Sequence, residues 1–340
     1  MSRRRDKILL AHGAGGRLTG ELIANTFLPA LANPHLEILS DAAVLPELPP
    51  GRPALTTDAF VVDPPVFAGG DVGRLSVCGT VNDLAMVGAT PLWLTWALIL
   101  EEGTDMGLVE QCTESAAEAA REAGVTIVAG DTKVVARGSG DKIFAITSGL
   151  GVVPPGRDIG DHRIRPGDAI LASGTLGDHG ATIMAARHAL ESATLRSDAA
   201  PVNALVKSLF DAAIDVHSLH DPTRGGLKSV ANEVAVRGKV RLVLEEDAIP
   251  VRPEATTVCE LLGLDPFGLA CEGRFLAWVA QSDADAAVAA LRNAPGGEDA
   301  AVIGRIEDAR PGMAPVVLEA RSGGTRPLDL LSGADLPRIC

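Results

Sequence analysis

Three aspartates lie beside small or polar residues, each near the predicted end of an apolar element. They are Asp58 in Thr-Thr-Asp-Ala, Asp83 in Asn-Asp-Leu-Ala and Asp131 in Gly-Asp-Thr-Lys. Carboxylates that converge on phosphate groups can hold Mg²⁺, which keeps several waters and needs few protein ligands. Each aspartate could instead cap or solvate a loop. Lys133, two residues after Asp131, is either a surface charge or a cation of an active site.

Two glycine-rich segments could bring backbone N–H groups close to phosphate oxygens. The first is His-Gly-Ala-Gly-Gly at residues 12–16, close to a predicted helix start, where an anion is favoured. It matches neither the GxGxxG fingerprint nor a Walker A loop, and a flexible turn is the alternative. The second is His-Asp-Pro-Thr-Arg-Gly-Gly at residues 220–226, a turn that precedes another predicted helix.

Two further residues have the chemistry of a base and of a carrier. Glu272 lies between Cys271 and Gly273, and a glutamate with apolar and small neighbours can be desolvated and act as a base near neutral pH. An exposed loop acid is the alternative. Cys340 ends the chain after a segment with several glycines and prolines. A thiol on a flexible arm can carry a covalent group between sites, although an incidental terminal residue is the other reading.

Elements of both kinds must position these residues. Apolar periodicity predicts helices at 19–31, 76–87, 181–190, 202–214, 227–236 and 283–294. A further helix is predicted to begin at a cap of Thr104 or Asp105, to run to about Ala123 and to end at Gly124. Strands are predicted at 54–62 (around a polar turn), 92–100, 126–129, 142–150, 169–172, 240–244, 275–280, 301–306 and 316–319. Strands and helices do not alternate strictly, which favours an α+β fold. Segments 153–156 and 165–167 bracket a predicted linker.

Composition excludes several classes of protein. The chain has 340 residues, enough for about two domains, and a formal net charge of −14. Such an acidic chain is not expected to bind nucleic acid or an anionic membrane. A hydrophobic fraction of 46% and a charged fraction of 22% exclude disorder as a class. Aromatic residues make up only 3%, so stacking platforms for single-stranded nucleic acid are not expected.

Cysteine use and apolar runs indicate a cytoplasmic protein. The five cysteines are odd in number and lack CxxC spacing, which argues against a disulfide framework or a thiolate zinc site. Cys78, Cys112, Cys259 and Cys271 are predicted to be small core residues. The apolar run after the basic N-terminus is too short for a signal peptide. The apolar stretch at 85–100 is interrupted and too short for a membrane span.

Taken together, these segments resemble the HypE family of hydrogenase maturation proteins, the carbamoyl dehydratases of the PurM-like (aminoimidazole ribonucleotide synthetase-like) superfamily. The matching motifs span nearly the whole chain: residues 12–16, Thr-Thr-Asp at 56–58, Val-Asn-Asp-Leu-Ala at 81–85, Gly-Asp-Thr-Lys-Val at 130–134, residues 221–226, Glu-Gly at 272–273 and the terminal Pro-Arg-Ile-Cys. The terminal motif is the most specific. Lys228 departs mildly from the pattern, because a small residue is expected there.

The resemblance implies a two-domain α+β fold of the PurM-like type, with a first domain that dimerises into a β-barrel-like core. Its expected divisions are a segment with the glycine-rich loop at 1–40, an ATP-binding domain at 41–155, a second domain at 165–320 and a mobile tail at 321–340. It also implies ATP and Mg²⁺ in a cleft between the domains, with Mg²⁺ at Asp58, Asp83 and Asp131. The residues expected to bind the nucleotide are Gly13, Gly15, Gly16, Asp58, Asn82, Asp83, Asp131, Asp221, Arg224, Gly225 and Gly226.

The implied reaction is the ATP-dependent dehydration of an S-carboxamide on Cys340 to a thiocyanate, which supplies cyanide ligands for the [NiFe]-hydrogenase centre. Glu272 would remove protons from the carboxamide, and Lys133 would orient it or neutralise the developing oxyanion. The carbamoyltransferase HypF would load the thiol, and a HypC–HypD scaffold would receive the cyano group. Whether the tail acts on its own protomer or on a neighbour stays open.

Two alternatives use the same residues differently. Another ATP-using member of the superfamily, such as a thiamine monophosphate kinase or a selenophosphate synthetase, would share the acidic motifs but has no use for a terminal Pro-Arg-Ile-Cys. A selenophosphate synthetase is also expected to carry a reactive cysteine or selenocysteine near the N-terminal glycines, and the first cysteine after Met1 is Cys78. The other alternative is a non-catalytic docking protein whose tail cysteine anchors it to a partner.

Overall fold

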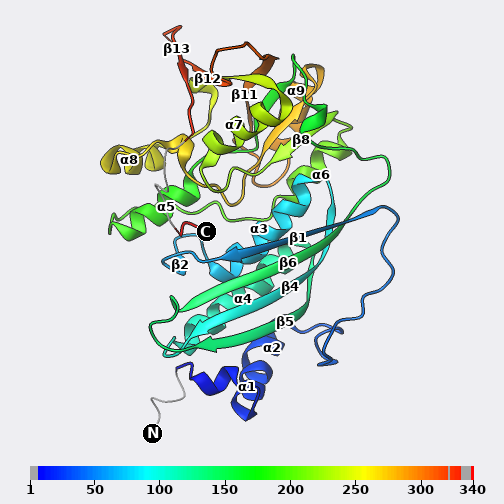
Figure 1. The fold of residues 1–340 in the computed structure, drawn as a ribbon, viewed down its shortest axis with the longest axis vertical. Helices are drawn as coiled ribbons and strands as arrows, with labels where there is room; N and C mark the ends of the chain where they lie inside the picture. Colours follow the sequence, from blue (N-terminus) through cyan, green and yellow to red (C-terminus); the bar gives the residue numbers. More distant parts are fainter. Residues whose placement is uncertain (1–6, 321, 331–337) are drawn as a thin grey trace.

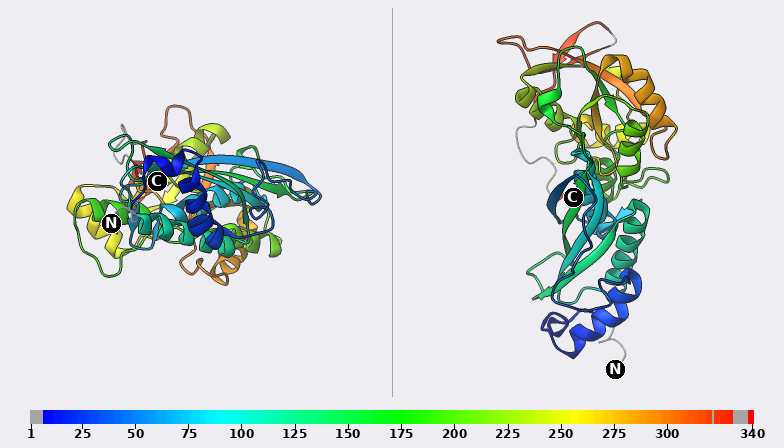
Figure 2. Two further views of the ribbon diagram at one scale, coloured as in Figure 1. Left: turned by 90° about the horizontal axis from the view of Figure 1, so that it is seen from below. Right: turned by 90° about the vertical axis from the view of Figure 1, so that its right-hand side faces the viewer.

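The structure is a computed structural model that describes residues 7–320, 322–330 and 338–340. Two α+β units are stacked along the longest axis of the molecule, and the last residues of the chain lie between them (Figures 1 and 2). The predicted α+β class is confirmed. In the described part of the chain, no helix is both long and apolar enough to cross a membrane.

The first unit is a four-stranded sheet with helices on one face (Figure 1). The strand order is β1-β6-β4-β5, in which β4 and β5 are parallel and the other neighbours are antiparallel. The bounds are β1 Arg52–Phe60, β4 Thr90–Glu101, β5 Thr126–Val135 and β6 Ile143–Val153. The helices are α3 Val72–Met86 and α4 Met106–Ala123, with a short hairpin of β2 Val66–Phe67 and β3 Gly70–Asp71 before α3.

Capping residues set the limits of these helices. Asp71 accepts hydrogen bonds from the N–H groups of Gly73 and Arg74, so α3 begins four residues earlier than predicted. Of the two predicted caps, Asp105 and not Thr104 caps α4, and Gly124 ends it in the left-handed conformation (φ 71°), as predicted. The predicted N-terminal helix is confirmed as a continuous helical run: α1 Arg17–Leu22, a π-helical turn Ile23–Phe27 and α2 Leu28–Leu31.

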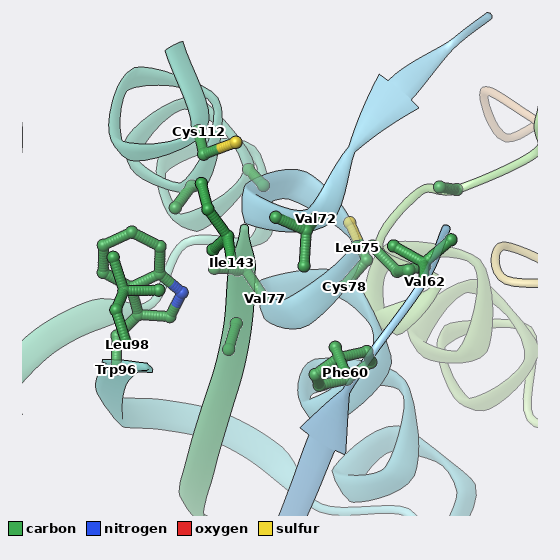
Figure 3. Packing of buried hydrophobic residues seen from close by; sticks show 14 of the residues in the cluster. Phe60, Val62, Val72, Leu75, Val77, Cys78, Trp96, Leu98, Cys112 and Ile143 are labelled. Atoms are coloured by element: carbon green, nitrogen blue, oxygen red, sulfur yellow. The ribbon is translucent and has the colours of Figure 1, made fainter. Parts of the chain in front are cut away.

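The core of the first unit lies between the sheet and helices α3 and α4. Figure 3 shows Cys78 and Cys112 packed there with apolar side chains such as Leu75, Ile143 and Trp96. The prediction of four buried core cysteines is confirmed, because Cys78, Cys112, Cys259 and Cys271 are all buried.

The second unit is a seven-stranded sheet in the order β13-β12-β9-β11-β7-β10-β8. The bounds are β7 Ala169–Ala172, β8 Val216–His220, β9 Val240–Glu245, β10 Leu276–Val279, β11 Ala301–Asp308, β12 Val316–Glu319 and β13 Thr325–Pro327. Its helices are α5 Asp178–Arg187, α6 Asn203–Asp211, α7 Gly226–Gly238, α8 Pro253–Leu262 and α9 Ala284–Arg292. Residues of α7 pack in one apolar cluster with the sheet, and residues of α6 and α9 in another.

Several local predictions were wrong. β1 runs through residues 54–60 without the predicted turn, and β5 continues past Gly130 to Val135. β8 and α8 were not predicted, since β8 mixes buried histidine and serine with apolar residues. Part of the predicted mobile tail is ordered, because β13 pairs with β12 and Leu328 is buried. The tail residues at 331–337, like residues 1–6 of the predicted N-terminal segment, lie outside the described residues.

Candidate functional site

Asp58 and Asp83 are fixed between strand β1 and helix α3. Because side chains alternate along a strand, Thr56 and Asp58 both face α3. The Thr56 hydroxyl donates to Asp83 Oδ2 at 2.8 Å, and the Thr80 hydroxyl donates to Asp58 Oδ2 at 2.9 Å. Each carboxylate therefore accepts a hydrogen bond from a threonine on the facing element, which holds the two acids close together.

Asp221 brings a third carboxylate to this pair from the second unit, directly after β8. Burial, with the negative charge of Asp83, raises the pKa of Asp221 to about 7. Burial, with the charge of Asp58, raises the pKa of Asp83 to about 6, and burial also raises the pKa of Asp58. We call Asp58, Asp83 and Asp221 the acidic cluster. Its members repel one another when ionised, and a bound cation would relieve that repulsion.

An open cleft of about 420 Å³ borders the acidic cluster. Its walls come from both units, including Thr56 and Asp83 on one side and His220 and Asp221 on the other. Over residues 7–320, 322–330 and 338–340, no three His, Cys, Asp or Glu side chains form a group able to hold a metal by themselves. Mg²⁺ is usually bound through one or two carboxylates with waters and substrate phosphates, so this cluster beside a cleft fits Mg²⁺ with a nucleotide.

Glu272 is buried next to the acidic cluster, and its backbone is held by two hydrogen bonds with side chains. The Asn82 side chain donates to the Glu272 carbonyl at 3.1 Å, and Asp198 Oδ1 accepts from the Glu272 N–H at 3.2 Å. The side chain of Glu272 is only 3% exposed, and its Oε1 has no hydrogen-bond partner among the described residues. Burial, followed by the negative charges of Asp221 and Asp198, raises the pKa of Glu272 well above its ordinary value.

The thiol of Cys340 meets Glu272. Cys340 is half-buried, and its thiol donates a hydrogen bond to the Glu272 carboxyl group. Burial and the charge of Glu272 raise the pKa of the thiol, while Arg224 opposes this. The last residue of the chain therefore lies beside a buried potential base and close to the acidic cluster. The structure therefore brings together the residue expected to act as the base and the residue expected to carry the substrate.

Asn82 and Gly226, expected to bind nucleotide, have packing roles here. Asn82 donates to the carbonyl of Ala200 as well as that of Glu272 and accepts from the Val202 N–H at 2.8 Å, so it ties α3 to the second unit. Gly226 has φ 58°, and a Cβ there would lie 2.4 Å from the Leu269 carbonyl oxygen. Neighbouring Gly225 (φ 77°) precedes the first turn of α7.

Asp131 and Lys133 lie elsewhere in the chain. In the sheet register, Asp131 of β5 lies opposite Ala97 of β4, Ala97 lies opposite Ile146 of β6, and Ile146 lies opposite Ala59 of β1. Asp131 therefore shares a sheet face with Ala59, the face opposite to Asp58, and β5 is at the other edge of the sheet. One chain does not bring Asp131 to Asp58 and Asp83. Asp131 is exposed and ion-paired with Lys133 at 2.7 Å, which lowers the pKa of Asp131.

The glycine-rich loop at 13–16 lies beside this second group. A Cβ on Gly13 would lie 2.5 Å from the Val134 backbone nitrogen of β5, and Gly15 has φ 79°. Nothing within 4 Å meets a Cβ built on Gly16. The predicted site residues thus form two groups within one chain: the acidic cluster with Glu272 and Cys340 between the units, and the loop with Asp131 and Lys133 at the far edge of the first sheet.

The sequence did not identify the residues that hold the end of the chain. His179 and Arg187 of α5 hydrogen-bond backbone carbonyls of Ile339 and Arg338, and Asp198 holds the Glu272 backbone. The sequence feature that could have indicated these residues is Gly-Asp-His-Gly at 177–180, an acid and a histidine between glycines, and all four residues are buried. The spacing of the histidines suggested no metal site, and His179 instead holds the Ile339 carbonyl by a hydrogen bond.

Comparisons place the chain among known proteins. Residues 39–153 match the family described as AIR synthase related protein, N-terminal domain, and residues 165–314 match its C-terminal domain. The carbamoyl dehydratase HypE of Rhodobacter capsulatus is 46% identical over 344 aligned residues, covering 100% of both chains. A crystal structure of the hydrogenase maturation protein HypE in complex with ATP is 46% identical, with a TM-score of 0.92 over 98% of this chain and 99% of that one. A HypE–HypF complex is 41% identical, with a TM-score of 0.79 over 93% and 100% of the two chains.

Proposed function

Because the chain belongs to the HypE family of carbamoyl dehydratases, we propose that it uses ATP to dehydrate a carboxamide carried on the sulfur of Cys340. The product is a thiocyanate, which supplies cyanide ligands for the [NiFe]-hydrogenase centre. The observation that carries this proposal is the contact between the terminal thiol and the buried Glu272, next to the acidic cluster and its cleft.

The reaction needs a good leaving group on the carboxamide carbon and acceptors for the two protons of the amide nitrogen. An amide oxygen leaves poorly, so it first takes the γ-phosphoryl group of ATP and ADP departs. The C–O bond then breaks with release of phosphate, the nitrogen gives up both protons, and a C≡N bond forms. One proton leaves with the phosphate, and Glu272 accepts the other. Mg²⁺ held by Asp58 and Asp83 would offset negative charge on the transferring phosphoryl group.

Burial suits Glu272 to this role. Its raised pKa makes the carboxylate a stronger base than an exposed glutamate, and the dry surroundings of a 3%-exposed side chain protect reactive intermediates from water. The clamp from Asn82 and Asp198 keeps the Glu272 backbone in place while the tail arrives and leaves. Arg224 supplies positive charge near Asp58 and Cys340, where phosphate charge would develop.

A homodimer is part of the proposal. The sheet face of the first unit that is not covered by α3 and α4 carries Leu55 (77% exposed), together with Trp93, Ile99 and Phe144, which are only partly buried. A second copy packed on this face would bury these apolar side chains. Asp131 and Lys133 lie on the same face, so their proposed contacts with Mg²⁺, phosphate or the carboxamide depend on that second copy.

Two partners follow from the reaction. A carbamoyltransferase must load Cys340, and HypF takes that role here, supported by the solved HypE–HypF complex of a relative. The thiocyanate carries its cyano group to an acceptor that holds iron, for which we assign a HypC–HypD scaffold. Both partners need the tail outside the cleft, since the docked thiol is half-buried against Glu272.

The test is to load Cys340 with a carbamoyl group and add ATP with Mg²⁺. The mass of the adduct should fall by about 18 Da, one water. Cys340→Ser should show no such change while it still binds ATP. A loaded chain that hydrolyses no ATP and keeps its mass would contradict the dehydratase proposal and favour a docking role for the tail.

A further inference from the structure

The last three residues of the chain occupy a groove between the two units. One wall is the extended segment 61–63 that follows β1, and the other is helix α5. The Val61 N–H donates to the Cys340 carbonyl at 3.2 Å, and the Asp63 N–H donates to the Arg338 carbonyl at 3.3 Å. These two hydrogen bonds join 61 with 340 and 63 with 338, so the tail runs antiparallel to this segment and is held by its main-chain carbonyls.

Helix α5 holds two of these three residues, Arg338 and Ile339, from the other side. His179 Nε2 donates to the Ile339 carbonyl at 2.8 Å. Arg187 donates to the Asp63 carbonyl at 2.7 Å and also to the Arg338 carbonyl, so one guanidinium joins both walls of the groove. Every carbonyl of residues 338–340 is therefore bound by a group of the groove. Hydrogen bonds to main-chain carbonyls give affinity without selecting a side chain, because every residue carries the same carbonyl group.

Two side chains of the tail add selectivity. Ile339 is only 3% exposed and packs in the apolar cluster that includes Phe67 and Ile183. The Arg338 guanidinium lies 3.0 Å from an Asp141 carboxylate oxygen and donates to the Val61 carbonyl at 3.3 Å. The groove therefore fits an apolar residue of isoleucine size before the cysteine, and a cation before that.

We propose that this groove is a recognition site for peptides that end in Arg-Ile-Cys, so that a free peptide bearing the S-carboxamide is dehydrated in trans. This inference rests on the proposed function and uses the same bond changes. The inference goes beyond the proposed function, because among the described residues of the tail, 338–340 make the contacts that place the cysteine at Glu272. A covalent link between tail and protein sets the local concentration but adds no contact at the site.

The experiment uses the full chain with its own tail displaced. The double variant Ile339→Asp/Cys340→Ser removes the carrier thiol and puts a charge where Ile339 is buried. We add ATP, Mg²⁺ and a synthetic peptide of residues 333–340 with the S-carboxamide. The peptide should lose about 18 Da in a saturable reaction. The same peptide with Asp in place of Ile339 should react with a kcat/KM lower by about 10- to 100-fold, because the apolar burial is lost.

A matched pair of groove variants separates recognition from general damage. His179→Gln keeps a side-chain N–H donor for the Ile339 carbonyl, whereas His179→Ala does not. In the tail-displaced chain, the alanine variant should raise the KM for the peptide more than it lowers kcat, and glutamine should restore part of the loss. Equal effects of the two variants, or a peptide whose Asp form reacts as well as its Ile form, would overturn specific recognition.

As a control, dehydration of the carbamoyl-loaded tail is measured in parallel in the chain with no substitution. If that tail loses water but the free peptide does not, the trans inference fails and the proposed function stands. If the peptide binds, as measured by fluorescence anisotropy, while neither tail nor peptide loses water, the proposed function fails.

Discussion

Asp221 offers a quantitative test of the acidic cluster. Its carboxyl group moves from an ordinary pKa of 3.8 to about 7 in the folded chain. A carboxyl whose folded pKa is raised binds more protons in the folded state, so it destabilises the fold as pH rises from its unfolded pKa to its folded pKa. This destabilisation is absent below about pH 4 and complete above about pH 7.

The magnitude follows from the size of the shift. For Asp221 the cost is about 4 kcal/mol at pH 8 and about 2 kcal/mol at pH 5, since one pKa unit equals about 1.4 kcal/mol. Asp221→Asn removes the titrating group and should therefore gain about 2 kcal/mol more at pH 8 than at pH 5. For a unit of this size, that difference corresponds to about 4–8 °C in melting temperature.

The assay is thermal and denaturant unfolding of both chains at pH 5 and pH 8, without nucleotide and with a chelator. Asp131→Asn is the matched control. The Asp131 carboxylate is exposed and its pKa is lowered by Lys133, so this variant should change little, and any pH trend should have the opposite sign. An Asp221→Asn effect that is equal at the two pH values would refute the argument that burial of the Asp221 carboxylate, with repulsion from Asp83, destabilises the fold at high pH.

Three further predictions address the base, the domain clamp and the dimer. Glu272→Gln should slow single-turnover dehydration by about 10²–10⁴-fold with ATP binding kept, measured by mass spectrometry of the loaded tail; full turnover would remove Glu272 from the role of base. Asn82→Ala leaves two backbone carbonyls and one N–H without their partner, and should lower the free energy of unfolding by about 2–4 kcal/mol in denaturant titration; an unchanged midpoint would show that water replaces the clamp. Leu55→Asp should convert the dimer to a monomer in sedimentation, whereas Leu261→Asp, on the exposed face of α8, should not; a Leu55→Asp dimer would contradict the proposed interface.

Local patterns predicted most elements near the site. Alternation predicted the strand that carries Asp58, and capping signals predicted the end of α4 at Gly124 and its start to within one residue, at Thr104 or Asp105, because these signals act within a few residues. Strand β8, which leads to Asp221, was missed because its pattern mixes polar and apolar residues that are all buried or nearly so. Burial on both sides of a sheet removes the alternation on which such predictions depend.

The candidate site likewise contains residues that local sequence patterns predicted and residues that they could not predict. Glu272 was predicted as a desolvated acid from its small and apolar neighbours, and it is 3% exposed. His179 and Arg187 could not be predicted, because their task is defined by the backbone of residues that lie more than 150 positions away. Asp131 looked equivalent to Asp58 and Asp83 in sequence, and only strand register separated it from them.

The sequence by itself determined the chemical inventory: a terminal thiol, a glutamate in an apolar setting, acids beside small residues, and a motif order that indicates the family. Only the tertiary structure decided which of these groups meet. Residues on one strand alternate between faces, and Asp131 is in register with Ala59, one residue after Asp58. Asp58 therefore faces α3, whereas Asp131 lies on the opposite face of the sheet. The burial that raises the pKa of Glu272 and seats Cys340 beside it arises from packing between two units, which no local pattern encodes.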